Sequence, residues 1–416
     1  NKMQISKTQI KWILAYGVGM FLSNQFFESY MRGLSPFNQI FLLTELHSNI
    51  LLKNTIPQTS EINSVAISPD GQTIVSRSKD NTITAWNLKT GKLLSTIAGN
   101  PDEKRTVLIS PDLQTVASSE EDGIRILDLK TGKLKTTLPN IGKKRVETFA
   151  FSPDGQTLIS NSGNVVYDPL FNEKSINIIE VWNLNTGKLK TTFKSDNFCV
   201  ESLVAVSKNG QMVMSCRDLG WSLTPGNINL KSWDVNTGKL KTTFSEKTDF
   251  AKPSEKSIDT LTISPDGQTF VTLSGRKTVK IWDLNTGKLK TTLPNPKDND
   301  IDSIVFSPDG QTLFTSNWGG IKLWNVKTGS LKTTLNYGDS IGSFAISQDG
   351  QTLVGKSSGT LIIWDLKTGR YKTALVNPDD KEYVKSVAIS PDGQTIVSSY
   401  WNSDNKPQSI KIWQMP

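Results

Sequence analysis

The chain has 416 residues, of which 36% are hydrophobic and 21% are charged, and its formal net charge is +8. This composition excludes a disordered chain and a polytopic membrane protein, and it allows a large buried core. The only histidine is His47, in a polar segment before the first repeat, and the only cysteines are Cys199 and Cys216. A multi-histidine metal site therefore cannot be assembled, and a Ser-His-Asp site would have to use this one histidine outside the repeats. We therefore expect no catalysis, no metal and no cofactor.

The first segment in chain order, residues 1–46, differs from everything that follows. Residues 12–22 are apolar or small throughout and come after Lys2, Lys7 and Lys11, an arrangement typical of a signal peptide or a signal anchor. A helix over residues 7–32 would be about 39 Å long, which is enough to cross a bilayer. The side chains expected to contact a membrane or a docking partner are Trp12, Ile13, Leu14, Tyr16, Met20, Phe21, Leu22, Phe26 and Phe27.

Three interpretations of this leader stay open, because Ser23, Asn24, Gln25 and Glu28 would be costly against lipid. It is a membrane anchor, a docking helix buried in a partner protein, or a secretion signal that is removed. As an anchor, it would hold the rest of the chain on the extracytoplasmic side of a membrane, either periplasmic or lumenal.

From residue 62 onward the chain repeats one pattern of four short strands. In the copy that begins near residue 258, Leu261–Ile263 alternates, Ser264-Pro265-Asp266-Gly267 forms a turn, and the third strand ends at Trp282. Alternation with period two between turn residues predicts antiparallel hairpins. The first turn recurs at Ser68, Ser110, Ser152, Ser207, Ser264, Ser307, Ser347 and Ser390. The third strands end at Trp86, Leu127, Trp182, Trp233, Trp282, Trp324, Trp364 and Trp413.

These turns and tryptophans resemble those of the WD-repeat β-propeller family, and the repeat sequences resemble those of bacterial, especially cyanobacterial, members. The resemblance covers nearly all of the chain after residue 47 and implies an all-β fold with eight four-stranded blades around a central channel. We therefore predict a leader helix with its linker over residues 1–46 and an eight-bladed propeller over residues 47–416. No repeat carries the family's Gly-His pair, so we expect the blades to pack mainly through apolar contacts.

The end of the chain predicts how the ring closes. The chain stops at Pro416, directly after the third strand of the eighth repeat. Residues 51–56 resemble in sequence the fourth strand at residues 93–97, but no repeat precedes them. An open ring would expose two unpaired sheet edges. Residues 51–56 are therefore predicted to complete the eighth blade.

Long insertions occur in only two of the four kinds of connection, at residues 161–174, 216–229, 245–257 and 400–408. Alternate connections of an antiparallel sheet lie on the same side, so these loops are predicted to share one face, which also carries Tyr337 and Tyr383. Exposed aromatic residues are typical anchors of protein interfaces. The predicted partner-binding residues are Tyr167, Phe171, Trp221, Phe250, Trp318, Tyr400 and Trp401. The alternative is that each loop folds its aromatic ring over its own blade.

The charged residues give no sign of a catalytic or nucleic-acid site. Carboxylates at residues 298–302 and 379–382 match no calcium loop and are interpreted as solvated loop charge. The lysines are spread around the predicted rim instead of forming a stripe with stacking aromatics, so nucleic acid is not expected as a partner.

These patterns together predict a non-catalytic scaffold for protein–protein interaction. The leader would associate it with a membrane, as an accessory subunit of a larger membrane protein complex. The resemblance of the repeat sequences to cyanobacterial members points to a photosynthetic membrane such as the thylakoid. The alternative is a secreted or periplasmic propeller that binds a small ligand or catalyses a reaction.

Overall fold

A computed structural model describes most of the chain after the leader. The described residues are 50–99, 107–120, 123–139, 146–166, 174–195, 204–207, 210–217, 228–246, 258–295, 299–317, 319–336, 341–357, 360–376, 382–402 and 408–415. Within these ranges the regular elements are β-strands, and there is no helix with the length and apolarity that a membrane crossing needs. The predicted leader helix over residues 7–32, with its membrane or docking side chains from Trp12 to Phe27, lies outside the described residues.

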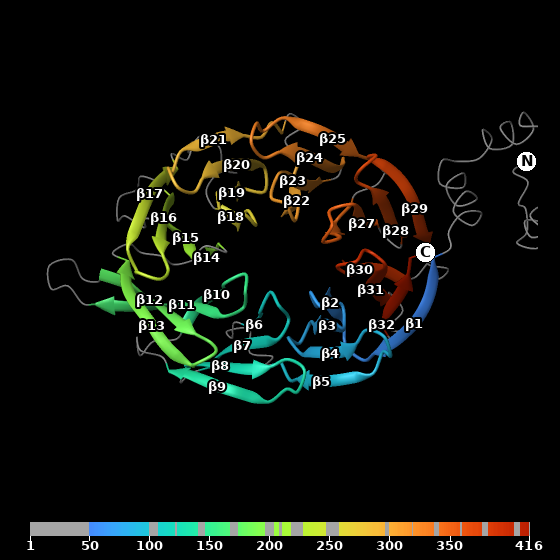
Figure 1. The fold of residues 1–416 in the computed structure, drawn as a ribbon, viewed down its shortest axis with the longest axis horizontal. Coiled ribbons are helices and arrows are strands. Elements are labelled where there is room, and N and C mark those ends of the chain that lie inside the picture. The colour runs from blue at the N-terminus through green and yellow to red at the C-terminus, as the bar shows by residue number, and fades with distance from the viewer. Residues whose placement is uncertain are drawn as a thin grey trace, which may run out of the picture.

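The strands form eight antiparallel four-stranded sheets, which confirms the predicted eight blades (Figure 1). The first strands, nearest the centre of the ring, are β2 (Ile62–Ile67), β6 (Val107–Ile109), β10 (Val146–Phe151), β14 (Val204–Val206), β18 (Ile258–Ile263), β22 (Ile301–Phe306), β26 (Ser343–Ile346) and β30 (Glu382–Ile389). The second strands are β3 (Thr73–Ser78), β7 (Thr115–Glu120), β11 (Thr157–Val166), β15 (Gln211–Arg217), β19 (Thr269–Ser274), β23 (Thr312–Asn317), β27 (Thr352–Ser357) and β31 (Thr395–Asn402).

The remaining strands complete the blades toward the rim. The third strands are β4 (Ile83–Asn87), β8 (Gly123–Asp128), β12 (Lys174–Asn183), β16 (Ile228–Asp234), β20 (Thr278–Asp283), β24 (Gly320–Asn325), β28 (Thr360–Asp365) and β32 (Gln408–Gln414). The fourth, outer strands are β5 (Leu93–Ile97), β9 (Leu134–Pro139), β13 (Lys188–Ser195), β17 (Leu240–Glu246), β21 (Leu289–Thr292), β25 (Leu331–Leu335), β29 (Arg370–Val376) and β1 (Leu51–Gln58). We number the blades 1 to 8 by their first strands, β2 to β30.

Each blade buries its middle strands between two neighbouring blades. In blade 5 all six residues of β19 are buried, whereas the outer strand β21 is largely exposed. Phe270 of this blade stacks on Trp282 at a centroid distance of 5.8 Å and meets the edge of Phe244 from blade 4 at 5.1 Å. Such contacts between aromatic rings of adjacent sheets supply much of the buried apolar area. A single blade would lose this burial on both faces, so the blades stabilise one another.

The tryptophans that end the third strands also make polar contacts, which qualifies the expectation of mainly apolar packing. In five blades the indole N–H donates a hydrogen bond to a serine or threonine hydroxyl on the second strand. These pairs are Trp86–Ser76, Trp182–Ser160, Trp282–Thr272, Trp324–Thr315 and Trp413–Ser398, with distances from 2.9 to 3.3 Å. A buried indole N–H without a partner would be destabilising. The hydroxyls thus satisfy the tryptophans although no repeat has a histidine.

The ring closes as predicted. β1 pairs antiparallel with β32, and Ile56 lies opposite Ile410. Ile56 is buried in a cluster that combines residues of blades 8 and 1, including Ile62 and Val397. The backbone N–H of Val65 in blade 1 also donates to the Ser386 hydroxyl of blade 8 at 3.2 Å. Blades 8 and 1 are therefore joined by apolar packing and hydrogen bonds like any other neighbouring pair.

Two of the expected insertion loops are partly strand. β11 continues to Val166 and β12 begins at Lys174, so residues 161–166 extend a β-hairpin beyond the length of the other blades. β31 likewise continues through Asn402, where residues 400–408 were expected to form a loop. Neither segment contains the Ser-Pro-Asp-Gly turn of the repeat, and continued pairing satisfies the backbone hydrogen bonds of these strand extensions.

Candidate partner-binding face

The two faces of the ring differ in how regular their connections are. One face, here called the turn face, carries the connections between first and second strands and between third and fourth strands. The opposite face carries the connections between second and third strands and between one blade and the next; we call it the irregular face. This division follows from the antiparallel order of each sheet.

The turn face is built from repeated hydrogen bonds. In the first turn of blade 6, the Ser307 hydroxyl donates to the Asp309 carboxylate, and the backbone N–H of Gln311 donates to the same carboxylate at 3.0 Å. The Ser307 hydroxyl holds the pKa of Asp309 below its ordinary value, and the Gln311 N–H lowers it further. A carboxylate with a lowered pKa is a poor general acid or base at neutral pH.

A cleft of 440 Å³ opens on the turn face between blades 6 and 7. Its lining comes from the repeated turns themselves, among them Pro308, Asp309 and Thr368. The cleft is thus a consequence of how two neighbouring turns pack. Within the described part of the chain, no group of three or more histidine, cysteine, aspartate or glutamate side chains is placed to hold a metal ion.

Of the seven predicted partner-binding residues, the structure describes two. Tyr167, Phe171, Trp221, Phe250 and Trp318 lie outside the described residues. Tyr400 was expected in a loop but is buried at 1% exposure, and Lys411 Nζ lies 4.2 Å from its ring centroid. Trp401 is 37% exposed. Since both residues belong to strand β31, adjacent side chains point to opposite sides of the sheet, and Tyr400 belongs to the core.

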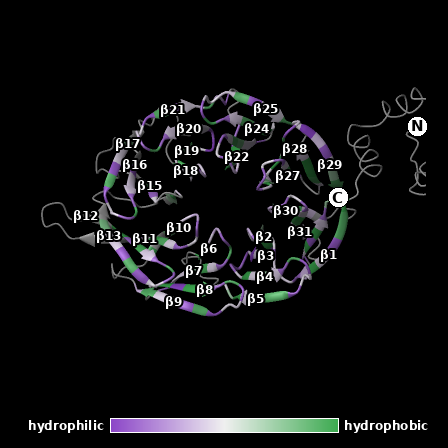
Figure 2. Ribbon diagram, in the orientation of Figure 1, coloured by the Kyte–Doolittle hydropathy of each residue, from purple (hydrophilic) through white to green (hydrophobic). Residues whose placement is uncertain are grey.

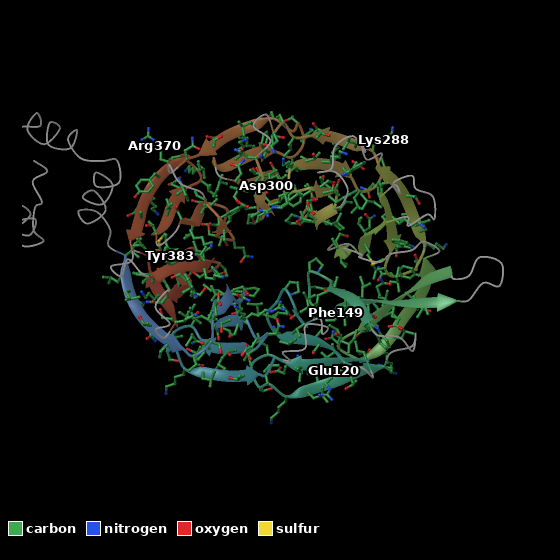
Figure 3. All side chains as sticks on the ribbon, turned by 180° about the vertical axis from the view of Figure 1, so that it is seen from behind. Glu120, Phe149, Lys288, Asp300, Arg370 and Tyr383 are labelled. Carbon is green, nitrogen blue, oxygen red and sulfur yellow. The ribbon has the colours of Figure 1, made fainter. Side chains whose placement is uncertain are left out.

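Trp401 forms an exposed pair with Tyr383, an aromatic residue that the sequence placed on the irregular face without counting it among the anchors. The two residues lie directly opposite each other on β31 and β30. Their ring centroids are 6.0 Å apart, and Tyr383 is 43% exposed (Figure 3). We call them the aromatic pair. Because both residues belong to paired strands, their rings are held in place in the unbound protein. This reduces the conformational entropy that is lost on binding.

Charged side chains from blades 7, 8 and 1 lie around this end of blade 8. Glu61 bridges Lys385 of blade 8 at 3.1 Å and Lys79 of blade 1 at 3.5 Å. The hydrogen bond from Lys385 lowers the pKa of Glu61 below its ordinary value. Lys356 of blade 7 donates to the Val384 carbonyl oxygen at 3.3 Å, and burial lowers the pKa of Lys356, with a further contribution from repulsion by Lys385.

The acidic stretch at residues 298–302 contains structural ion pairs, where solvated loop charge was expected. Arg276, in the turn between β19 and β20 of blade 5, donates to Asp302 at 2.7 Å and lies 3.7 Å from Asp300. Asp300 belongs to the connection into blade 6 and Asp302 to its first strand, β22, so these pairs link two blades. Asp298, Asp379 and Asp380 lie outside the described residues.

Comparison with known proteins agrees with this fold. Residues 51–87, 245–283, 287–325, 329–365 and 373–414 match the family model of the WD domain, G-beta repeat. Among solved structures, the computationally designed Ika8 protein matches with a TM-score of 0.59 at 21% identity, over 86% of this chain and 98% of that chain. At this identity the likeness shows the fold alone.

Several curated proteins match part of the chain. It is 36% identical over 134 residues to small ribosomal subunit protein RACK1 of Neurospora crassa, covering 30% of this chain and 42% of that protein. It is 34% identical over 134 residues to MST50-interacting protein 11 of Pyricularia oryzae, again covering 30% and 42%. It is 25% identical over 164 residues to autophagy-related protein 16 of Arabidopsis thaliana, covering 38% and 30%. The matches span less than half of each relative, and these eukaryotic proteins do not indicate the bacterial or cyanobacterial type that the repeats suggested.

The Glu61 bridges generate a prediction about pH. The folded pKa of Glu61 lies below its unfolded value, so its contribution to stability is present above about pH 4.3 and is lost as the pH falls through the lowered folded pKa. We expect Glu61→Gln to reduce the free energy of unfolding by about 0.5–1 kcal/mol at pH 7. Urea unfolding at several pH values measures this difference, which should shrink as the wild-type carboxylate is protonated.

Lys385→Gln is the matched control, because it removes the partner and leaves Glu61. The double variant should lose less than the sum of the two single variants. A difference between wild type and Glu61→Gln that stays constant from pH 7 to about pH 3 would contradict the assignment, because the charged form of Glu61 would then contribute nothing.

Proposed function

Because the chain belongs to the WD40-repeat family, we propose that it is a non-catalytic scaffold that binds protein partners through its irregular face. The observation that carries the proposal is the aromatic pair, Tyr383 and Trp401, exposed on strands of a rigid blade. Tyrosine and tryptophan are enriched among the residues that dominate binding energy at protein interfaces. One relative, MST50-interacting protein 11, is named for an interaction with another protein.

The surroundings of the aromatic pair also favour a protein partner. Lys385 follows Tyr383 by two residues on β30 and pairs with Glu61, which also bridges Lys79. An aromatic centre with a polar margin is the usual anatomy of a protein interface. The turn face, by contrast, is made of near-identical turns whose carboxylates are already hydrogen-bonded within the chain, as at Asp309.

The proposal includes membrane association through residues 1–46, as an accessory subunit of a larger membrane protein complex. The apolar run at residues 12–22, preceded by three lysines, supports an anchor. The leader is continuous in sequence with β1, which is the outer strand of blade 8. A tether at the rim leaves the aromatic pair accessible to partners.

The partner-binding part is tested by the double variant Tyr383→Ala with Trp401→Ala. Removing a pair of interface anchors costs about 2 kcal/mol or more, which is about a 30-fold loss of affinity. The full-length chain serves as bait in extracts of its native cells, and quantitative mass spectrometry compares the co-purified proteins. Partners retained by wild type should be depleted with the variant.

Tyr371→Ala is the control, because Tyr371 is exposed to a similar extent, 38%, but lies on the outer strand of blade 7. This variant should keep the wild-type set of partners. Equal recovery of every partner with wild type and the double variant would overturn the role of this face.

The membrane part is tested by Leu14→Asp with Met20→Asp in the full-length chain. An aspartate near the centre of a spanning segment disfavours insertion by about 2.5–3.5 kcal/mol. The protein should therefore move from the membrane fraction to the supernatant after centrifugation. Ser6→Asp, outside the apolar run, should leave the distribution unchanged. A double variant that still sediments with membranes would contradict the anchor.

A further inference from the structure

The outer strands share a sequence pattern from which two adjacent blades each depart at one position. In blades 2 to 7 an exposed leucine or tyrosine at the beginning of the strand is followed directly by lysine. These pairs are Leu134-Lys135, Leu189-Lys190, Leu240-Lys241, Leu289-Lys290, Leu331-Lys332 and Tyr371-Lys372. A lysine at this position protects an exposed sheet edge and keeps the rim hydrated.

Blades 8 and 1 each carry two consecutive leucines, at positions that differ by one. Leu52 lies opposite Trp413 and Leu93 lies opposite Trp86, so both match the leucine of the other blades. Leu51 therefore stands where most blades have a basic residue before that leucine, and Leu94 stands where the other blades, including blade 8 with Lys53, have the lysine after it. Leu51 and Leu52 begin β1 with exposures of 65% and 49%, and Leu93 and Leu94 begin β5 with 55% and 41%. We call these four residues the leucine rim. Figure 2 shows both strands in the hydrophobic colour over much of their length.

The third-strand residue at the base of the outer strand is uncharged in both blades. In blades 2, 4 and 5 this residue is an aspartate that pairs with the outer-strand lysine, as Asp128 does with Lys135 at 3.6 Å. The corresponding residues are Asn87 in blade 1 and Gln414 in blade 8. Blade 8 keeps the outer-strand lysine as Lys53, whereas blade 1 has Leu94 in its place and therefore carries neither charge.

The two leucine pairs are neighbours in space. The turn before β5 packs directly on β1, because a side chain added at Gly91 would overlap Asn54 and contact Ile56. Gly91 also has a positive φ of 68°, which favours glycine. β1 and β5 therefore lie next to each other on the rim (Figure 1). The leucine rim is one patch across the closure of the ring.

The charge around the leucine rim is purely positive in the local sequence. Lys53, Lys89 and Lys92 are exposed beside it. No acidic residue occurs at residues 47–60 or 81–101, which include both strands and the turn between them. Exposed leucine beside lysine is the combination that binds the interface of an anionic bilayer, where the apolar side chain enters the headgroup region and the cation remains at the phosphates.

We propose that the leucine rim rests on an anionic bilayer surface and so fixes the orientation of the propeller at the membrane. This inference rests on the proposed membrane attachment by the leader. Residues 1–49 precede the patch and join it directly at Ile50, so an anchor within them would hold Leu51 and Leu52 close to the lipid. A tether raises the effective concentration of the attached surface, and a weak contact is then sufficient.

The size of the patch argues against a second copy of the chain as the occupant. A specific protein interface uses about 20–30 residues on each side. Four partly exposed leucines and three lysines are far fewer. A contact on a bilayer has no such minimum, since the leader supplies the remaining attachment.

A fluorescence experiment tests the proposal with the full-length chain. In a Cys199→Ser, Cys216→Ser background, an environment-sensitive dye is attached to Leu93→Cys, or to the matched control Leu289→Cys at the same repeat position of blade 5. The outer margin carries Lys288 next to position 289 in blade 5, and it carries Arg370 at the equivalent place in blade 7 (Figure 3). The rim at the control position is therefore cationic. The proteins are mixed with phosphatidylcholine–phosphatidylserine vesicles that contain brominated lipid.

Flotation of the vesicles measures attachment, and quenching of the dye measures proximity of the rim to lipid. We expect both proteins to float, with about threefold more quenching at position 93 than at position 289. Leu51→Lys with Leu94→Lys, which restores the basic residues that most of the other blades carry at these positions, should reduce the quenching at position 93 without abolishing flotation. Circular dichroism confirms that this surface variant is folded.

The two possible failures are distinguishable. Flotation with equal quenching at positions 93 and 289, or with none at either, would overturn the leucine rim and leave the membrane attachment standing. If the wild-type chain does not float, the attachment fails and the inference fails with it. Neither result bears on protein binding by the irregular face.

Discussion

The pairing of β1 with β32 is the constraint on which the rest of the structure depends. Each blade is a thin sheet that buries its apolar residues only against two neighbours, as Phe270 and Phe244 do across blades 4 and 5. A ring has no terminal blade, so every sheet is covered on both faces once the last one is complete. The strand that completes blade 8 comes from the opposite end of the propeller sequence, so closure joins residues more than 350 positions apart.

Closure also bears on where the two proposed contact surfaces lie on the ring. The repeated turns of one face are held by their own hydrogen bonds, such as the Ser307–Asp309 pair, and vary little from blade to blade. The irregular face lacks these repeated turns, and it carries the aromatic pair, on strands β30 and β31, and the Glu61 bridges. Blades 8 and 1 are further distinguished by the leucine rim, so both proposed contact surfaces lie near the place where the ring closes.

The sequence predicted the fold well because the repeat combines two independent signals. Strand alternation gives the hairpins, and eight Ser-Pro-Asp-Gly-like turns matched by eight third-strand ends give the number of blades. The closure was predictable because residues 51–56 match an outer strand without a repeat of their own. The family match and the pairing of β1 with β32 confirm these predictions.

The candidate site was less predictable because its connections lack the repeated Ser-Pro-Asp-Gly turn. Residues 161–174 contain Gly163 and Pro169, and residues 400–408 contain Pro407, but Gly163 is paired inside β11, so these residue types did not indicate where pairing stops. Two extra residues of strand in β31 then decide that Tyr400 points inward and Trp401 outward. The pairing of Trp401 with Tyr383 depends on the register across the β30 bulge between Val384 and Ser386, which no single-strand pattern reveals.

The most direct test of the account is a disulfide across the closure. Thr55 and Lys411 lie directly opposite each other on β1 and β32. With both replaced by cysteine in the Cys199→Ser, Cys216→Ser background, mild oxidation should give an intrachain disulfide, and the oxidised protein should unfold at a higher urea concentration than the reduced one. Thr55→Cys with Lys280→Cys, the same repeat position in blade 5, should not crosslink. A failure of the Thr55–Lys411 pair to crosslink within one chain, or a yield no greater than that of the control, would contradict the closed ring.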